Sequence, residues 1–457
     1  MKSGYYFIFW HSLHNWTFKI MILCIYIYMA GKRRSGLAND KRAYICRTSI
    51  IPTYTVTYNG NSNTSGNAPD SSSYKFGSTV TVLGNSGSPI LSKTGFTFSG
   101  WNTSANGSGT SYSEANTFTI NSNIILYAQW SVMTLSAPTA LSSVGGNTEA
   151  YILFTQSGTI TNYEYSTDDG ATFLAFDPPQ IYSPVNIKWL SDGVTPLTND
   201  TTYTVKLKAV NSGALSSESE SIEVTPTITS LLSANRIIYL DANNSDSYSG
   251  SGNSWTNLDS GGNYSAVLNG SPTFNTTGNY FEFNPGELTG QFAQINQASA
   301  INPVLNQPFT IQMWVRINNI GGQGSLLSKV FGAPSYDGYA LGYRTDNTIQ
   351  LHENGSSRVN YFTSVSGVLT SGWALYTANI QFGNGGGRSN KIFVNGRQIM
   401  TSISTEGGIP TNNQNLTFPR GFYGEGECDI GQFYYYNTEL TTTQIIQNFD
   451  ATKHTYD

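Results

Sequence analysis

The sequence predicts a mainly β protein, and three observations lead to this fold class. Apolar and polar residues alternate over short stretches, as in the run YTVKLKA at 203–209. Turn signals follow such stretches, among them Asn-Gly at 59–60 and Asp-Gly at 169–170. Aromatic residues make up 13% of the chain and charged residues only 11%, a composition typical of folded sheets and opposite to that of disordered chains.

Length and charge limit the number of domains and the kinds of partner. At 457 residues the chain is long enough for about two to four domains. Residues 1–50 carry eight Lys or Arg and one acid, Asp40, so the remainder has a net charge of −12. Such an acidic body excludes the wrapping of nucleic acid in a basic groove, because Lys and Arg supply most of that affinity.

The cysteines and histidines exclude a disulfide framework and a structural zinc site. The three cysteines, Cys24, Cys46 and Cys428, are too few and too scattered for a disulfide framework. The four histidines form no zinc-ligand spacing with them. The domains must therefore be stabilised by their hydrophobic cores.

Residues 1–52 form an apolar and basic, leader-like segment. An apolar run at 20–30 is shorter than the ~20 residues that span a membrane, and a basic cluster follows it at 32–34. Three interpretations of this segment are possible. It is an atypical signal peptide or signal-anchor, or a buried structural segment, or the start codon is assigned too early and Met21 or Met29 is the initiator. A start at Met29 would imply a leaderless protein, carried on a virus particle or released on lysis.

Residues 53–131 carry motifs in a recognisable order: YTVTYNGN at 54–61, KTGFTFSGWNT at 93–103, GSGTSY at 107–112 and ILYAQW at 125–130. This segment resembles one Listeria–Bacteroides repeat, the B-repeat of internalin-type surface proteins. The resemblance implies a small β-grasp-like fold that serves as a stalk or interaction unit. Large aromatics on alternating strands usually fill the interior, so we interpret Trp101 and Trp130 as core residues.

Residues 134–227 resemble a fibronectin type III domain, an immunoglobulin-like β-sandwich. The resemblance rests on an early Ser-Ala-Pro-Thr at 136–139, on Leu197 six residues before Tyr203 in a long alternating strand, and on the closing SIEVTP at 221–226. It implies that the domain serves mainly as a spacer and only secondarily as a binding domain. We predict that Tyr203 is a buried corner tyrosine and that 168–170 is a turn.

Residues 230–457 contain many short strands separated by glycine turns, a pattern typical of a large two-sheet sandwich. The motifs YLDA at 239–242, PFTIQMWVRI at 308–317, KIFVNGRQI at 391–399 and DIGQFYYYN at 429–437 resemble the concanavalin A-like lectin/glucanase superfamily, in its laminin-G-type branch. The resemblance implies a jelly-roll β-sandwich that binds sugars or protein ligands, often with Ca²⁺. A helix is expected at 440–449, capped by Thr441 or Thr442.

No catalytic residues are predicted. Glucanases of this superfamily carry a strand motif with two carboxyl groups, because glycoside hydrolysis generally needs two of them at one scissile bond. The nearest match here contains Glu427 and Asp429 but ends in Gln432, which cannot act as an acid. The sequence therefore favours a protein that binds without hydrolysing.

Two sets of ligand residues are predicted. Calcium prefers oxygens from Asp, Asn and backbone carbonyls, and sugars need an aromatic ring with amide or carboxylate partners. For each residue an ordinary solvated turn is the alternative. The candidate calcium ligands are Asp241, Asn243 and Asp246, and the candidate glycan residues are Tyr336, Asp337, Tyr339, His352 and Asn354.

These features together predict a non-enzymatic surface or extracellular protein for adhesion or recognition. The C-terminal domain would bind a glycan or a surface protein, and the N-terminal modules would form a stalk. Ca²⁺ is the one cofactor that the resemblance implies. The membrane would be a partner only through an N-terminal signal-anchor. The alternatives are a structural fibre or virus-particle surface protein and, third, a relic of a glycoside hydrolase.

Overall fold

The computed structural model describes residues 22–24, 46–48 and 51–456, except 260–262, 285–289, 305, 331–337, 356–357, 365, 383–387, 405–413 and 422–423. Most of the predicted leader-like segment lies outside these residues. The chain divides into two compact units: the first comprises Met1–Thr134 with Asn211–Ala214, and the second comprises Leu135–Val210 with Leu215–Asp457. The predicted ranges 134–227 and 230–457 therefore share one unit, and their boundaries stay predictions.

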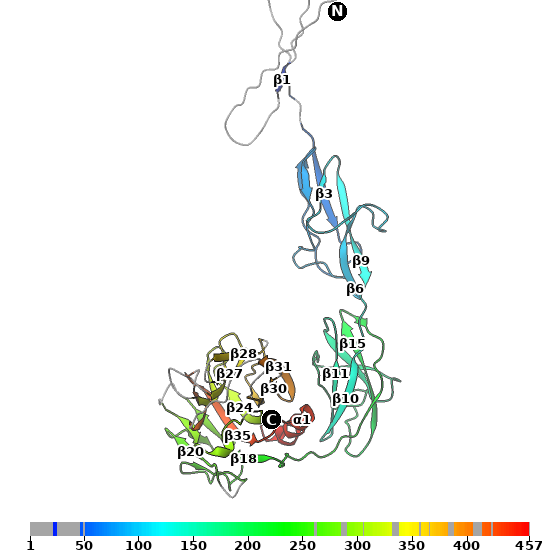
Figure 1. Ribbon diagram of the computed structural model, residues 1–457. Coiled ribbons are helices and arrows are strands. Elements are labelled where there is room, and N and C mark those ends of the chain that lie inside the picture. The colour runs from blue at the N-terminus through cyan, green and yellow to red at the C-terminus, as the bar shows by residue number, and fades with distance from the viewer. Residues whose placement is uncertain are drawn as a thin grey trace, which may run out of the picture. The chain divides into compact units, whose positions relative to one another are not determined.

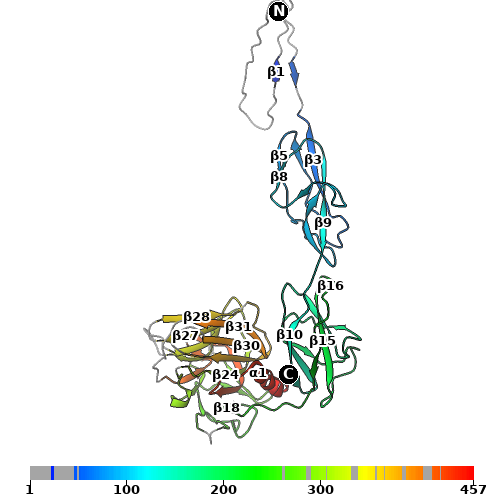
Figure 2. The same ribbon diagram turned by 45° about the vertical axis from the view of Figure 1, so that its right-hand side comes forward.

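The first unit is built on one five-stranded sheet (Figure 1). Its strands β3 and β9 are parallel, and the other neighbours are antiparallel. A second, two-stranded sheet joins β5 to β8, and both lie close to β3 in Figure 2. The strands are β1 (Ile22–Cys24), β2 (Cys46–Thr48), β3 (Thr53–Asn59), β4 (Ser72–Lys75), β5 (Thr79–Thr81), β6 (Phe96–Asn102), β7 (Ser111–Tyr112), β8 (Thr117–Thr119) and β9 (Ile124–Val132).

The core of the first unit forms around Trp101, which is only 1% exposed. Its ring contacts those of Tyr58 and Phe98 at centroid distances of 4.8 and 5.1 Å, and its Nε1 donates to the Leu83 carbonyl at 2.8 Å. Trp130 is partly buried and packs against the same cluster. The interpretation of both tryptophans as core residues is confirmed.

The second unit begins with a sandwich, here called the N-terminal sandwich, of a three-stranded and a five-stranded sheet. Residues of both sheets form one core that includes Ile152 and Leu207. Tyr203 is partly buried, and its hydroxyl accepts from the Thr198 amide at 3.1 Å. The strands are β10 (Thr139–Gly146), β11 (Glu149–Thr155), β12 (Asn162–Ser166), β13 (Leu174–Ala175), β14 (Val185–Ile187), β15 (Tyr203–Asn211), β16 (Ala214–Leu215) and β17 (Ile222–Val224).

The rest of the unit, here called the C-terminal sandwich, has two eight-stranded sheets. The first sheet runs β21-β22-β35-β24-β29-β30-β31 with β18 beside β35, and the second runs β19-β20-β23-β32-β25-β26-β27-β28. The first sheet comprises β18 (Arg236–Asp241), β21 (Thr273–Asn275), β22 (Tyr280–Phe283), β24 (Phe309–Ile317), β29 (Trp373–Ile380), β30 (Arg388–Val394), β31 (Arg397–Ser404) and β35 (Cys428–Tyr436). The second comprises β19 (Ser254–Trp255), β20 (Ala266–Asn269), β23 (Phe292–Ile295), β25 (Gly324–Val330), β26 (Gly338–Tyr343), β27 (Ile349–Gly355), β28 (Arg358–Thr363) and β32 (Leu416–Phe418).

Side chains along β35 point alternately to the two faces of the first sheet, and both faces are buried there. Phe433 and Tyr435 belong to the core between the sheets, whereas Tyr434 and Tyr436 belong to a separate cluster on the opposite face. That cluster includes Ile445 of α1 (Thr442–Thr452), so the helix covers the outer face of the sheet. The remaining elements are β33 (Arg420–Gly421), β34 (Gly424–Glu425) and the 3₁₀ turns η2 (Ser299–Ile301) and η3 (Lys453–Thr455).

The predicted fold class is confirmed, since the described chain is mainly β with a jelly-roll-type sandwich at its C-terminal end. The predicted C-terminal helix and its cap are also confirmed. Thr441 is the N-cap, and its hydroxyl accepts from the Gln444 amide at 3.3 Å while the Gln444 side chain accepts from the Thr441 amide at 2.9 Å. This reciprocal capping box fixes where the helix begins.

Candidate functional site

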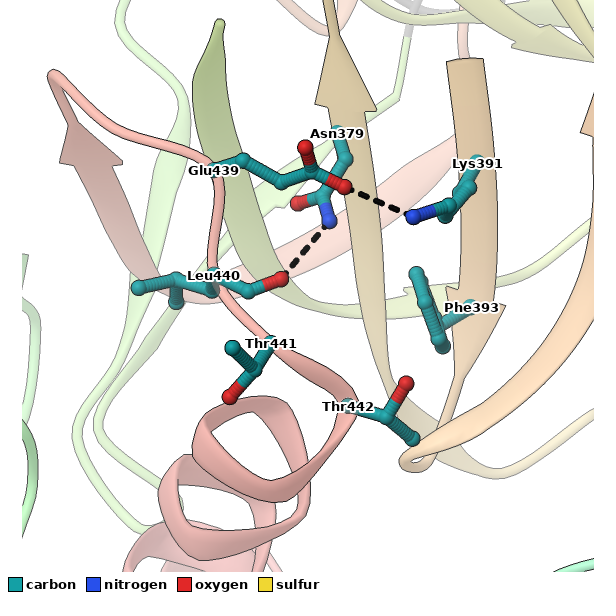
Figure 3. Close-up of a pocket in the computed structure, with 7 residues that line it drawn as sticks. All are labelled: Asn379, Lys391, Phe393, Glu439, Leu440, Thr441 and Thr442. Atoms are coloured by element: carbon teal, nitrogen blue, oxygen red, sulfur yellow. Dashed lines mark hydrogen bonds and ion pairs between the residues drawn. The ribbon is translucent and has the colours of Figure 1, made fainter. Parts of the chain in front are cut away.

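A pocket of about 410 Å³ lies on the outer face of the first sheet, where β29 and β30 meet the chain leading into α1. Figure 3 shows the residues that line it. The sheet contributes one wall, and the segment 439–442 contributes the other. Its volume falls within the range of about 300–1,000 Å³ that is usual for small-ligand sites. The lining residues are Asn379, Lys391, Phe393, Glu439, Leu440, Thr441 and Thr442.

An ion pair crosses the mouth of this pocket. Lys391 Nζ lies 2.8 Å from Glu439 Oε1, and the two side chains are 32% and 34% exposed. Both groups can therefore be reached from solvent. A ligand hydroxyl can accept from the ammonium, and its neighbour can donate to the carboxylate.

The interior of the pocket is apolar and fixed by the fold. Phe393 and Leu440 are each 1% exposed. Asn379 is also buried, and its amide donates to the Leu440 carbonyl at 2.8 Å while its oxygen accepts from the Thr310 hydroxyl at 2.7 Å. Because the Asn379 side chain is engaged in this way, it positions the wall and is not left for a ligand.

Hydroxyl groups complete the side of the pocket nearest the helix. Figure 3 shows the Thr442 hydroxyl on the side of Phe393, whereas the Thr441 hydroxyl points away from that ring. This agrees with the role of Thr441 in the capping box. The pocket thus combines one accessible cation, one accessible anion and the Thr442 hydroxyl over buried apolar side chains, and its lining side chains carry no net charge. Such a set suits a neutral polyhydroxylated ligand.

Family comparisons agree with two of the sequence-based resemblances. Residues 54–129 match the Listeria–Bacteroides repeat domain, and residues 288–446 match the concanavalin A-like lectin/glucanases superfamily. The second match lies within the C-terminal sandwich, which is here called the concanavalin A-like domain after it. Both resemblances are therefore confirmed, and the fibronectin type III resemblance of residues 134–227 stays a prediction.

Two proteins of Evansella cellulosilytica share part of the sequence. A putative membrane protein is 41% identical over 81 residues, and a putative Gly-rich membrane protein is 37% identical over 111 residues. These matches cover 18% and 24% of this chain but only 12% of each relative, so the chain spans about an eighth of their length.

Two solved structures of binding domains match about half of this chain. The receptor-binding domain of a botulinum neurotoxin C/D mosaic serotype is 14% identical with a TM-score of 0.36, covering 48% of this chain and 52% of that one. The binding domain of Paraclostridial Mosquitocidal Protein 1 is 14% identical with a TM-score of 0.38, covering 47% and 52%. Similarity at this level says nothing about what the present chain binds.

The predicted glycan residues do not gather at the pocket. Tyr339 lies in β26 and His352 in β27, and both are 0% exposed, so neither presents a ring face to solvent. Asn354 lies in the same strand as His352, opposite Gly338 in the register. Tyr336 and Asp337 fall outside the described residues. The binding role assigned to this set stays a prediction.

The predicted calcium ligands are largely occupied by protein donors. The Asp241 carboxylate accepts from the Tyr239 hydroxyl at 2.8 Å, from Gln432 Nε2 at 3.0 Å and from the Asn243 amide at 2.9 Å. Asn243 Oδ1 accepts from Asn279 at 2.7 Å. Burial raises the pKa of Asp241, although these hydrogen bonds oppose the rise.

The loop therefore does not offer the convergent set of free oxygens that calcium takes. Asp246 is exposed, with its backbone amide bonded to the Asn244 side chain. In the part of the chain that the structure describes, no group of three or more His, Cys, Asp or Glu side chains could hold a metal ion. Calcium binding stays a prediction.

The carboxylate of the near-catalytic motif is engaged in a structural contact. Asp429 is 1% exposed and accepts from Arg316 Nε at 2.8 Å and from Asn318 Nδ2 at 3.0 Å. Gln432 donates instead to Asp241. The pocket itself contains a single carboxyl group, that of Glu439. The single carboxyl group of the pocket does not provide the pair that glycoside hydrolysis generally requires.

Lys391 and Glu439 were not predicted as site residues. They are 48 positions apart, one in β30 and the other in the turn before α1. Lys391 begins one of the motifs that carry the family resemblance, but nothing in that motif distinguishes a binding lysine from an ordinary surface one. The pairing of Lys391 with Glu439 depends on how the chain before α1 packs against the sheet.

Proposed function

We propose that the protein is a non-enzymatic recognition protein of the cell surface or extracellular space, and that its concanavalin A-like domain binds a neutral glycan in the pocket at Lys391 and Glu439. The observation that carries the proposal is the pairing of a solvent-accessible donor, Lys391, with a solvent-accessible acceptor, Glu439, at the pocket. Sugar rings have vicinal hydroxyls, one of which can accept from the ammonium while its neighbour donates to the carboxylate, so they complement this arrangement.

A surface location is supported by the kinds of domain that the chain contains. Listeria–Bacteroides repeats and concanavalin A-like domains are the two families matched, and the Evansella relatives are named as putative membrane proteins. No helix among the described residues has both the length and the apolar character needed to cross a membrane. Detection of the native protein on intact cells by antibody, compared with permeabilised cells, tests the location.

Replacing either member of the ion pair is expected to weaken glycan binding about tenfold to a hundredfold. Lys391→Met and Glu439→Gln each remove one charged hydrogen-bonding group at nearly constant volume. A hydrogen bond to a charged group contributes about 1.5–3 kcal/mol, which corresponds to that change in Kd. A glycan array identifies a ligand for the full chain, and calorimetry then gives the Kd of each variant.

The matched control is the pair of Lys208 and Glu218 in the N-terminal sandwich, whose Nζ and Oε1 are 3.3 Å apart and whose side chains are 20% and 40% exposed. Lys208→Met should leave the Kd unchanged. Equal weakening by this control variant would show that charge in general, and not the pocket, governs binding. A blank array together with self-association of the chain on size-exclusion chromatography would instead support the alternative of a structural fibre or particle protein.

Binding in the pocket is expected to persist when calcium is removed. The lining side chains supply every polar group that the proposed contact uses, and the candidate calcium residues Asp241, Asn243 and Asp246 are not among them. Calorimetry in EDTA should therefore return the same Kd as in calcium. Loss of binding in EDTA, restored by calcium, would place the ion in the recognition step and contradict this mechanism. A fall in Tm on chelation alone would locate calcium elsewhere in the fold.

A further inference from the structure

Helix α1 is buried on two sides. Ile445 and Ile446 are adjacent in the sequence, and they are 0% and 1% exposed. Adjacent helical positions point about 100° apart, so a helix lying on one surface buries one of them more than the other. Ile445 joins the cluster on the first sheet of the concanavalin A-like domain, whereas Ile446 joins a cluster with Val144 and Tyr151 of the N-terminal sandwich.

A polar cluster surrounds this second contact and is here called the α1 joint: Glu149, Tyr151, Asp450 and Lys453. Asp450 belongs to α1, is 1% exposed, and accepts from the Tyr151 hydroxyl at 3.0 Å and from Lys453 Nζ at 2.7 Å. Its second oxygen accepts from the Asn147 backbone amide at 2.8 Å. One buried carboxylate thus receives a backbone and a side-chain donor from the N-terminal sandwich.

Lys453 is the cation of the α1 joint and contacts its other three residues. Its ammonium lies 2.5 Å from Glu149 Oε2 and donates to the Tyr151 hydroxyl at 2.8 Å. Glu149 also accepts from Asn186 at 2.7 Å and pairs with the more exposed Lys188 at 3.2 Å. Buried charges are stable only when paired and hydrogen-bonded, and each charged group of the joint meets that condition.

The backbone of the N-terminal sandwich comes so close to α1 at Gly146 that no side chain fits there. A Cβ atom at Gly146 would lie 2.7 Å from the Asp450 carboxylate and 2.8 Å from the Tyr151 ring. The partly buried Leu153 and Phe449 extend the apolar part of the contact, and the rings of Tyr151 and Phe449 meet edge to face at 6.5 Å. Close packing, apolar burial and satisfied charges occur together, as in permanent interfaces.

We infer that the outer side of α1 is an interaction surface whose partner is the N-terminal sandwich of the same chain, and that this sandwich is permanently docked through the α1 joint. The sandwich is then part of the recognition unit and not a freely moving spacer. The two sandwiches already belong to one compact unit. The inference does not depend on the nature of the ligand in the pocket.

Cleavage of the connection between the sandwiches tests the docking in the full chain. Ile228 is 80% exposed, so a specific protease site inserted after it is accessible to the enzyme. After cleavage, the two pieces should co-elute on size-exclusion chromatography at about 1 μM protein, where weakly bound pieces separate. Separation of the cleaved pieces, each still folded by circular dichroism, would overturn the inference.

Charge reversal then tests the α1 joint itself. Lys453→Glu places a third carboxylate beside Glu149 and Asp450, and it should raise the Kd of the cleaved pieces at least about tenfold. Lys75→Glu changes the net charge equally at an exposed position of β4 and should have no effect. Adding Glu149→Lys to Lys453→Glu should restore co-elution. Unchanged co-elution of the Lys453→Glu pieces, or no recovery in the folded double variant, would contradict the assigned role of the joint.

Discussion

Trp101→Ala is expected to lower the free energy of unfolding of the first unit by about 3–5 kcal/mol, the usual cost of removing a large buried aromatic side chain. The variant would lose the ring contacts with Tyr58 and Phe98, and it would leave the Leu83 carbonyl without its indole donor. Because the described residues of the unit pack into one core cluster, a cavity at its centre affects all of that core. Differential scanning calorimetry of the full chain measures the change.

The two units should respond separately to this change. They are distinct compact bodies, so the transition assigned to the second unit should keep its Tm. Phe76→Ala is the matched control, since Phe76 is an aromatic residue of the same unit that is 53% exposed, and its loss should cost less than about 1 kcal/mol. Equal destabilisation by the two variants would contradict the central place given to Trp101.

Arg316→Met is expected to destabilise the concanavalin A-like domain by about 2–3 kcal/mol at neutral pH. It leaves the Asp429 carboxylate, which is 1% exposed, with only Asn318 as its side-chain donor. Breaking a fully buried pair costs about 3–5 kcal/mol, and the smaller value allows for the 34% exposure of the Arg316 side chain. The guanidinium also lies over the rings of Tyr280 and Trp373, and the variant loses both contacts. Urea unfolding followed by tryptophan fluorescence gives the difference.

The cost of Arg316→Met should depend on pH in a definite direction. Burial raises the pKa of Asp429, while hydrogen bonds from Asn318 and Arg316 partly oppose the rise. A carboxyl whose pKa is higher in the folded state destabilises that state once it is ionised, so the penalty grows as the pH rises from about 3.9 through the folded pKa. Loss of Arg316 raises that pKa further. The deficit of the variant should therefore be smallest near pH 4, where only the lost ring contacts contribute, and largest at pH 7.

Two further variants separate this cause from general damage. Arg420→Met removes an arginine that lies 3.7 Å from Glu425 and is 48% exposed, and an exposed pair of this kind contributes less than about 1 kcal/mol. Adding Asp429→Asn to Arg316→Met removes the unpaired charge and should recover part of the lost stability while abolishing the pH dependence. A deficit that is the same at pH 4 and pH 7 would exclude the buried carboxylate as its source.

The local features of the fold could be predicted because they depend on neighbouring residues. The helix after β35 begins where Thr441 and Gln444 form their capping box, a pattern of two residues three positions apart. The turn at 168–170 places Asp169 and Gly170 at positive φ, which Asp and Gly tolerate. The same reasoning identified Trp101 as a core residue, because it ends an alternating aromatic run.

The candidate site could not be predicted in the same way. Tyr339 and His352 belong to segments predicted to bind sugar through an aromatic ring with amide or carboxylate partners, but β26 is buried along its whole length and His352 is fully buried in the adjacent β27. No local pattern tells a strand covered on both faces from one open to solvent on one face. The residues that do line the pocket come from β29, β30 and the turn before α1, and their pairing is long-range.

Alternation, turn chemistry and capping act over a few residues, so the β class, the two confirmed family resemblances and the position of the C-terminal helix could all be predicted from local pattern. Local pattern does not show that Lys391 pairs with Glu439, that Arg316 binds the Asp429 carboxylate, or that α1 is buried on two sides. Each of these depends on which distant segments the folded chain brings together, and burial and pairing are properties of that arrangement.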